Sequence, residues 1–185
     1  MLILASESPR RRELLKRVYP EFEIRSADVT EISAGADLFS VPVQNAAAKA
    51  MKVAQAHPDA LVLGADTVII FDGKIIGKPR DIEDAKRILL GFSGREHSVV
   101  TGVALVRMGK NPVRVSYFEE SKVKFKAIGE NVVTGYLERV QVLDKAGAYA
   151  IQEHGNMIIE YSTGELENII GLPLEKLATL INKYL

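Results

Sequence analysis

Hydrophobic positions along the chain form two kinds of pattern, short apolar runs typical of buried strands and spaced apolar positions typical of helices. The first run, residues 2–5, is wholly apolar and predicts a strand buried on both faces. Ser8 followed by Pro9 predicts a helix start, because a serine side chain caps free helical N–H groups and proline suits the first turn. The inward stripe of that helix consists of Leu14, Leu15 and Val18.

The clearest helix is predicted over residues 41–56 and ends at His57-Pro58. Lys49 lies away from the apolar stripe of this helix, so helical phase alone predicts a surface lysine. The stripe itself consists of Val43, Ala46, Ala47, Ala50, Met51 and Ala54.

Strand patterns dominate the middle of the chain. Apolar runs at 61–64 and 67–71 flank Ala65-Asp66 and predict either a pair of strands or one bent strand. Residues 97–108 and 113–127 predict a long hairpin, because apolar and lysine residues alternate in its second arm. Further strands are predicted at 22–27 and 157–160, and further helices at 81–91, at 130–140 and from Pro173 onward.

Helices and strands interleave in this order, but the long hairpin interrupts them. We therefore expect an α/β fold with a mixed sheet rather than a purely parallel one. Residues 1–185 are expected to form one domain, with a break near residue 95 that separates two lobes around a cleft.

Composition and charge exclude several classes of function. The 185 residues include 24 lysines and arginines, 24 aspartates and glutamates, and no cysteine. Zero formal charge argues against a protein that coats nucleic acid or an anionic membrane, because such binding needs an excess of basic residues. The absence of cysteine excludes disulfides and thiolate metal sites. No apolar run is long enough for a membrane span, and the first five residues do not resemble a signal peptide, so we expect a cytoplasmic protein.

The sequence has no P-loop, no G-x-G-x-x-G, no H-E-x-x-H and no G-x-S-x-G pattern. Its chemistry must therefore rest on carboxylates, arginine, lysine and hydroxyl groups. Such groups suit a hard cation such as Mg²⁺ and suit phosphates.

The first candidate site is the strand-to-helix junction at residues 6–12, which begins with Ser6 and contains three arginines. A helix N-terminus there attracts phosphate, and ligands of open α/β sheets bind beyond strand ends. Arg11 lies on the inward stripe, three, four and seven residues before the apolar positions, so it is the arginine expected to enter a cleft. The alternative is a solvated basic helix start, but cations there oppose the helix dipole.

Asp66 is the second candidate, because a carboxylate between apolar runs needs a partner, a metal or a catalytic role. A turn aspartate is the alternative. Lys78 is presented at a fixed place by Pro79, although this segment alone favours an ordinary loop before a capped helix. Gln152 follows a run of small residues and has an amide that can read a base edge, and an ordinary loop glutamine is the alternative. Glu31, near Asp28, is a second potential metal-binding carboxylate, although a solvated loop explains it equally well.

Taken together and in this order, these segments resemble the Maf family of nucleoside triphosphate pyrophosphatases. The resemblance spans nearly the whole chain. It rests on Glu31, on Ala48-Lys49-Ala50, and on LASESPRRRELL at 4–15, LGADTVI at 63–69, GKPRD at 77–81, SGREHSVVTGVAL at 93–105, KAGAYAIQ at 145–152 and GLPL at 171–174.

The resemblance implies a fold similar to inosine triphosphatase, with an elongated mixed sheet, flanking helices and two lobes around a central cleft. It implies hydrolysis of a nucleoside triphosphate to the monophosphate and pyrophosphate, with a divalent cation, Mg²⁺ or Mn²⁺, and it admits a homodimer. An alternative that stays open is a nucleotide-sensing protein that regulates septum formation without relevant turnover.

The family's site residues map onto matching positions of this sequence. Asp66 resembles the family's proton acceptor, and Asp66 or Glu31 would hold the metal. Lys49 and Glu31 match further polar cleft positions. The positions that distinguish members acting on dTTP and UTP from those acting on 7-methyl-GTP are Arg11, Thr67, Lys78 and Gln152, and the residues here match the dTTP/UTP pattern.

Overall fold

A computed structural model describes residues 1–35 and 37–185 of the chain, and within them seven strands form one twisted sheet. The strand order is β2-β1-β3-β5-β6-β7, and the short β4 pairs with β3 outside this path. The strands are β1 (Leu2–Leu4), β2 (Phe22–Ile24), β3 (Leu61–Phe71), β4 (Lys74–Ile76), β5 (Glu96–Arg107), β6 (Val113–Phe125) and β7 (Ile159–Thr163).

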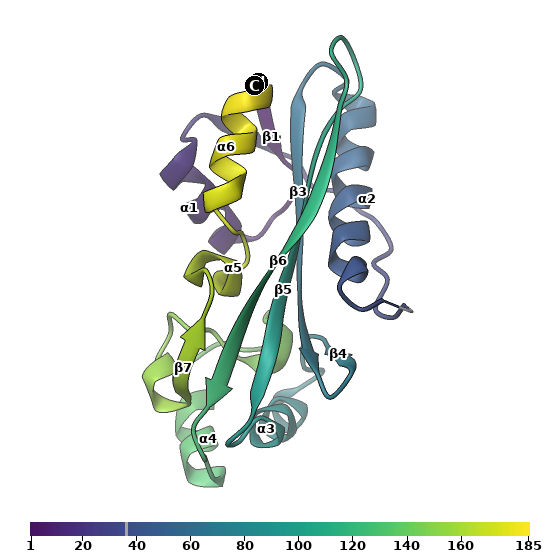
Figure 1. Ribbon diagram of the computed structural model, residues 1–185. Helices are drawn as coiled ribbons and strands as arrows, with labels where there is room; N and C mark the ends of the chain where they lie inside the picture. The colour runs from purple at the N-terminus through teal and green to yellow at the C-terminus, as the bar shows by residue number, and fades with distance from the viewer. Residues whose placement is uncertain (36) are drawn as a thin grey trace.

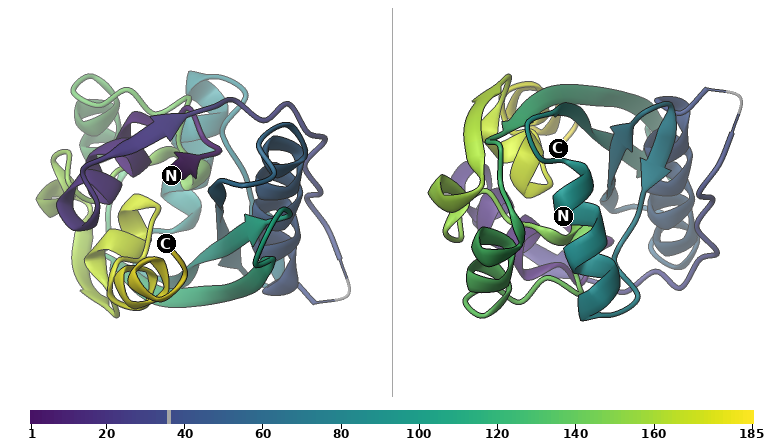
Figure 2. Two further views of the ribbon diagram at one scale, coloured as in Figure 1. Left: turned by 90° about the horizontal axis from the view of Figure 1, so that it is seen from above. Right: turned by 90° about the horizontal axis from the view of Figure 1, so that it is seen from below.

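Helices cover both faces of the sheet (Figure 1). Helix α2 lies along one face of the long β3, β5 and β6 strands, and α1, α5 and α6 lie on the other side, as the view from above also shows (Figure 2). Helices α3 and α4 gather at the end of the molecule where β7 lies. The helices are α1 (Pro9–Val18), α2 (Ser40–Ala56), α3 (Ile82–Gly91), α4 (Glu130–Leu137), α5 (Leu166–Ile170) and α6 (Glu175–Tyr184), with 3₁₀ turns η1 (Ala146–Ala148) and η2 (Gly155–Met157).

The mixed α/β class expected from the sequence is confirmed. Strand β1 pairs in parallel with β2 and β3, whereas β3, β5, β6 and β7 pair antiparallel. Residues 61–71 form one continuous strand, which settles the alternative left open by the pattern. Ser8 and Asp81 cap α1 and α3, because their side chains accept the Arg11 and Asp84 N–H groups.

Several boundaries differ from the sequence-based expectation. Strand β2 ends at Ile24 and not at residue 27, α4 ends at Leu137 and not at residue 140, β7 spans Ile159–Thr163 and not 157–160, and the last helix starts at Glu175 rather than at Pro173. Helix α5 was not predicted at all. A five-residue helix offers too few apolar positions for a periodic pattern, which is why the sequence gives no signal for α5. In the described part of the chain, no helix combines the length and apolarity that crossing a membrane requires.

Residues of β3 alternate between two apolar clusters on opposite faces of the sheet. Leu61, Leu63 and Ala65 pack in the cluster under α1 and α6. Val62 belongs to the cluster under α2. Because successive side chains of a strand point to opposite faces, Asp66 continues the stripe under α2 and Thr67 continues the stripe under α1.

Helix α2 approaches the sheet closely because two strand positions facing it are glycines. A Cβ built on Gly102 would overlap the backbone of Pro42, and one on Gly64 would overlap the carbonyl oxygen of Ala46. Gly102 lies opposite Asp66 in the β3–β5 register. This close contact therefore fixes how far α2 stands from Asp66.

The third apolar cluster, between α3, α4 and the lower end of the sheet, encloses a histidine. The His97 ring is 3% exposed and stacks on Phe92, with ring centroids 4.3 Å apart. Its Nε2 atom lies 2.8 Å from the Tyr149 hydroxyl oxygen. Burial lowers the pKa of His97 to about 3, so the ring is neutral in the folded protein at neutral pH.

We predict that Gly102→Ala destabilises the fold by about 1–3 kcal/mol, because the added methyl group forces α2 away from the sheet. Urea unfolding measures the change in the free energy of unfolding. Gly91→Ala is the matched control, since a Cβ there meets nothing within 4 Å. Equal unfolding free energies for the two variants would contradict the close packing described above.

Stability should also depend on the protonation of His97. An unfolded histidine has a pKa of about 6.5, so between pH 6.5 and about 3 the unfolded chain binds more protons than the folded one. The free energy of unfolding should therefore fall as the pH drops below about 6.5, by up to about 1.4 kcal/mol per pH unit. Urea unfolding of His97→Gln, which does not titrate, should show a shallower decline between pH 6.5 and 4.5. Parallel pH profiles in the two proteins would count against this account.

Candidate active site

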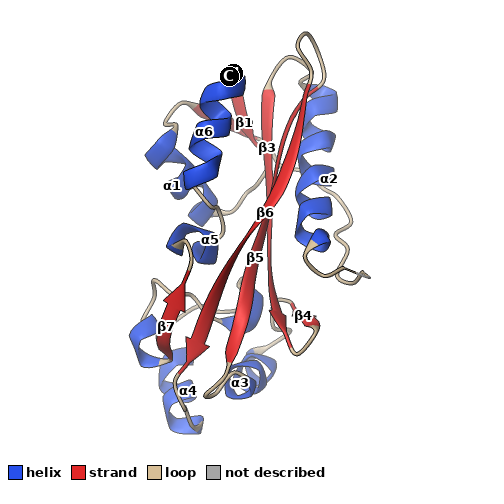
Figure 3. Cartoon of the chain, in the orientation of Figure 1, coloured by secondary structure: helices blue, strands red, loops and turns tan. Residues whose placement is uncertain are grey.

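The site is built around a gap on one edge of β3. Along this edge, β3 pairs with β1 through Leu63 and with β4 only from Ile69 onward. The opposite edge is paired continuously with β5 from Val62 to Ile70. In Figure 3, β1 lies above the gap and β4 below it. A ligand can therefore approach β3 from this edge and reach side chains on both faces of the sheet.

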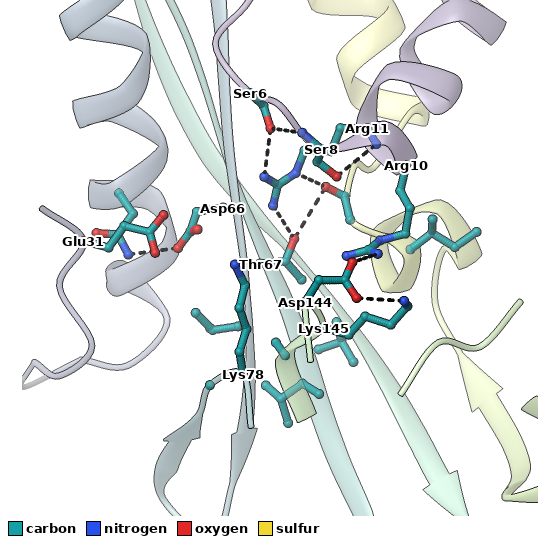
Figure 4. Close-up of a pocket in the computed structure, with 18 of the residues that line it drawn as sticks. Ser6, Ser8, Arg10, Arg11, Glu31, Asp66, Thr67, Lys78, Asp144 and Lys145 are labelled. Carbon is teal, nitrogen blue, oxygen red and sulfur yellow. Dashed lines mark hydrogen bonds and ion pairs between the residues drawn. The ribbon is translucent and has the colours of Figure 1, made fainter. Parts of the chain in front are cut away.

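At this edge of β3 lies a cavity of about 680 Å³, a size typical of small-molecule sites. The structure brings all of the site residues expected from the sequence to its walls. They are Ser6, Arg11, Glu31, Lys49, Asp66, Thr67, Lys78 and Gln152. Figure 4 shows Asp66 and Glu31 on the α2 side, Ser6 and Arg11 on the α1 side, and Lys78 extending from the β4 side toward the level of Asp66 and Thr67.

The acidic wall of the cavity, Asp66 and Glu31, is held together by Lys49. The Lys49 Nζ atom lies 2.9 Å from Asp66 Oδ1 and 2.6 Å from Glu31 Oε1. The side chains of Lys49 and Asp66 are only 11% and 10% exposed, whereas that of Glu31 is 54% exposed. Asp66 Oδ2 accepts a second hydrogen bond from Asn45 Nδ2 at 2.9 Å. Both oxygens of this carboxylate are thus bound on the α2 side.

The expectation that Lys49 is a surface residue was wrong. The buried positions of α2 include Asn45, Ala46, Lys49, Ala50 and Val53, so the buried face is rotated relative to the alanine-rich stripe. Ala46, Ala50 and Ala54 of the predicted stripe are fully buried, whereas its other members, Val43, Ala47 and Met51, are only half-buried. The lysine is stabilised inside because two carboxylates face it.

The opposite wall of the cavity carries Arg11, whose contacts fix the guanidinium plane. Its Nε donates to the Gly171 carbonyl oxygen at 2.9 Å, Nη1 to Ser6 Oγ at 3.3 Å and Nη2 to Thr67 Oγ1 at 3.1 Å. Three of the five guanidinium N–H donors are used within the described residues, and one on each terminal nitrogen is left for a ligand. Burial lowers the pKa of Arg11, and the Asp66 charge opposes this effect, so the group stays cationic.

A chain of hydroxyl groups supports Arg11 from behind. Thr67 Oγ1 accepts from Arg11 and lies 2.9 Å from Thr101 Oγ1 on the neighbouring strand. Thr101 Oγ1 in turn donates to the Asn168 carbonyl oxygen at 3.1 Å. Asn168 belongs to α5, and Gly171 directly follows it. The segment around this unpredicted helix therefore supplies the carbonyl oxygens that orient Arg11, directly from Gly171 and through Thr101 from Asn168.

The rim of the cavity adds an ion pair between distant parts of the chain. Arg10 Nη1 lies 2.8 Å from Asp144 Oδ2, and Asp144 Oδ1 also accepts from Lys145 Nζ at 2.9 Å. All three residues line the cavity. Lys78 and Gln152 also line the cavity, and their side chains are exposed. The Gly147 N–H donates to the carbonyl oxygen of Gly77 at 2.9 Å, which ties the backbone next to Lys78 to η1.

Sequence reasoning placed Arg10 within the candidate junction at residues 6–12 but missed Asn45, Asp144 and Lys145 as cavity residues. A signal was available for Asn45, since it lies one helical turn before Lys49 and thus on the same helix face. No local pattern links Arg10 with Asp144, which are 134 positions apart.

The donor set for a metal is limited. No group of three or more histidine or carboxylate side chains within residues 1–35 and 37–185 has the spacing to hold a metal ion alone. Asp66 and Glu31 provide two carboxylates, and Mg²⁺ typically binds one or two carboxylates together with substrate phosphates. The residues present therefore fit a cation that arrives with a phosphate ligand.

Comparison with known proteins gives a consistent result along the entire chain. Residues 1–184 match the family model described as Maf-like protein. A protein from Dictyoglomus thermophilum named dTTP/UTP pyrophosphatase is 42% identical over 98% of this chain and 95% of its own length. A protein of the same name from Clostridioides difficile is 40% identical over 99% of this chain and 94% of its own.

Solved structures share the fold at much lower sequence identity. A HAM1 protein from Coxiella burnetii superposes with a TM-score of 0.58 at 16% identity and covers 98% of both chains. The Ham1 protein of Staphylococcus aureus gives a TM-score of 0.54 at 13% identity, again over 98% of both chains. The sequence match over residues 1–184, together with relatives about 40% identical, shows that the chain belongs to the Maf-like protein family.

Proposed function

We propose that this chain is a nucleoside triphosphate pyrophosphatase that hydrolyses dTTP and UTP, or modified pyrimidine triphosphates, to the monophosphate and pyrophosphate. The observation that carries the proposal is the meeting of Asp66, Arg11 and Lys78, from three distant segments, in one cavity. The names of the relatives support the substrate class. We further propose that residues 1–185 act as one cytoplasmic domain, as their lack of cysteine suits a reducing compartment.

The triphosphate tail is expected to lie between the two walls. Arg11 offers one N–H group on each terminal nitrogen, a geometry that suits two phosphate oxygens. Lys78 adds a second positive charge from the β4 side of the gap (Figure 4). Ser6 and Thr67 accept the other N–H of each terminal nitrogen, and the Gly171 carbonyl oxygen accepts the Nε N–H, so the position of the arginine is fixed before substrate binds.

Asp66 is the proposed proton acceptor for the water that attacks the α-phosphorus. Its carboxylate is anchored on the side of α2 by Lys49 and Asn45, and each oxygen keeps a lone pair for the water. The attack forms a bond between the water oxygen and the α-phosphorus, breaks the bond to the bridging oxygen, and releases pyrophosphate. Most of the rate enhancement should come from position and charge, as in other phosphoryl transfers.

A divalent cation, Mg²⁺ or Mn²⁺, fits this site if it binds together with the substrate phosphates. Asp66 and Glu31 are the side chains that would hold it, and Glu31 is the more exposed of the two. One carboxylate can hardly be both an inner metal ligand and the base, so Glu31 is the better ligand if Asp66 takes the proton. When bound, the cation neutralises charge on the phosphate oxygens.

Base selection is assigned to Gln152, and binding of the phosphates to Arg11 and Lys78. Gln152 lines the cavity, and its carboxamide can donate and accept hydrogen bonds at a pyrimidine edge. Thr67, expected from the resemblance to influence specificity, is proposed to act by holding Arg11. The homodimer implied by the resemblance stays a prediction.

Asp66→Asn should reduce pyrophosphate release from UTP by about 100-fold or more, because the amide cannot accept the water's proton. The assay measures pyrophosphate release from a panel of triphosphates with Mg²⁺ and with EDTA. Asp59→Asn, an exposed aspartate before β3, is the control and should keep normal activity. Near-normal turnover by Asp66→Asn would remove this residue as the base, and binding without turnover by the unaltered protein would favour a nucleotide sensor.

Gln152→Ala should change the ratio of UTP to GTP turnover by about 10-fold, more than it changes the turnover of UTP itself, because a lost hydrogen bond to the base alters discrimination. Gln141→Ala, in the same segment but outside the cavity, serves as the matched control. An unchanged ratio in Gln152→Ala would exclude the residue from base recognition.

A further inference from the structure

Asn45 makes an unusual set of contacts for a residue in the middle of a helix. It lies in α2, is 4% exposed, and has every polar group of its amide bonded. Its Nδ2 donates to Asp66 Oδ2 at 2.9 Å and to the Ile32 carbonyl oxygen at 2.9 Å. Its Oδ1 accepts the Ile32 N–H at 2.9 Å. The amide thus binds Asp66 and the backbone of Ile32 at the same time.

These contacts link two parts of the acidic wall that are far apart in the sequence. The paired bonds to Ile32 dock the loop that carries Glu31 against α2. Glu31 is thereby placed 2.6 Å from Lys49, which also contacts Asp66. A single amide therefore sets the position of the loop carboxylate and of the strand carboxylate.

The bond to Asp66 also fixes how its carboxylate is turned. The terminal torsion of an aspartate is broad, so one ion pair to Lys49 leaves the plane of the carboxylate free to rotate. With Oδ1 held by Lys49 and Oδ2 held by Asn45, rotation is prevented. The remaining lone pairs then point in set directions. The other charged groups near Asp66 are Glu31, Arg11 across the cavity and Lys78 at its lower wall.

Asparagine is the residue type that this position requires. Two N–H donors on one nitrogen serve two acceptors, and the oxygen serves a backbone N–H. Leucine would have a similar shape but would leave Ile32 and Asp66 Oδ2 without these partners, at a cost for each buried group. Aspartate would keep the acceptor, lose both donors and place a second negative charge beside Asp66.

We propose that Asn45 is a positioning residue of the active site, which orients the Asp66 carboxylate and docks the Glu31 loop without itself reacting. The proposal rests on the proposed function of Asp66. Outer contacts of this kind commonly change activity by 10- to 100-fold when removed. A residue that only stabilises the fold would change the unfolding free energy without acting through Asp66.

The test is a double-mutant cycle on pyrophosphate release from UTP with Mg²⁺, using the full chain. Asn45→Leu should lower kcat by about 10- to 100-fold and change KM by less than about 3-fold. In the Asp66→Asn background the same change should lower kcat by a clearly smaller factor, because the part of its effect that acts through Asp66 is already absent and only the part that acts through the Glu31 loop remains. Gln44→Leu is the matched control, since Gln44 is the exposed neighbour on α2 and bonds only Ser40 within the described residues.

Urea denaturation of each variant gives its unfolding midpoint and verifies that the protein assayed is folded. Asn45→Asp provides a second route if Asn45→Leu does not fold, and it should also lower kcat with little change in KM. A kcat within 3-fold of the unaltered protein, or an equal loss in both backgrounds, would overturn the proposal. Normal turnover by Asp66→Asn alone would instead overturn the proposed function of Asp66, so the two failures are distinguishable.

Discussion

Between Leu63 and Ile69, strand β3 is paired on one edge only, and the position of the site follows from this gap. Strand β1 ends at Leu4, just before the helix that carries Arg11, and β4 begins only after the hairpin turn. Neighbouring residues Asp66 and Thr67 point to opposite faces of the sheet, yet both line one cavity because no strand in the described part of the chain pairs with this edge of β3 beside them. A continuous partner strand here would separate the carboxylate side from the arginine side.

Charge is arranged across this gap in two separate walls. On the α2 side, Lys49 neutralises part of the charge of two carboxylates, which allows three ionised groups to lie close together where water is partly excluded. On the α1 side, Arg11 is held by hydroxyl and carbonyl oxygens, and within residues 1–35 and 37–185 no carboxylate bonds it. Among these residues its charge is therefore offset by no bonded anion, which suits a group that attracts a polyphosphate.

Much of this arrangement could be predicted from the sequence, because local signals were strong where the chain changes direction. Ser8-Pro9 gave the start of α1, and helical phase from Leu14 and Leu15 correctly placed Arg11 on the inner side. The apolar runs around Asp66 indicated a carboxylate that needs a partner. Alternation along β3 then explains why Asp66 and Thr67 face different helices.

The remaining features depend on contacts between distant segments, which local patterns do not encode. Helical phase misplaced Lys49 because Val43, Ala47 and Met51 marked a face of α2 that is only half-buried, while Asn45 and Lys49 are buried and bonded to Asp66. Helix α5 is too short for a periodic signal, although its segment provides acceptors for Arg11 and Thr101. The ion pair between Arg10 and Asp144 likewise could not be predicted, because it joins residues 134 positions apart.

We propose that the two walls direct water to the α-phosphorus of a bound triphosphate. Hydrolysis of UTP in ¹⁸O-labelled water with Mg²⁺, followed by mass spectrometry of the products, locates the phosphorus that is attacked. We expect ¹⁸O in the monophosphate and none in the released pyrophosphate. Label in pyrophosphate, or release of orthophosphate in place of pyrophosphate, would show that water attacks elsewhere.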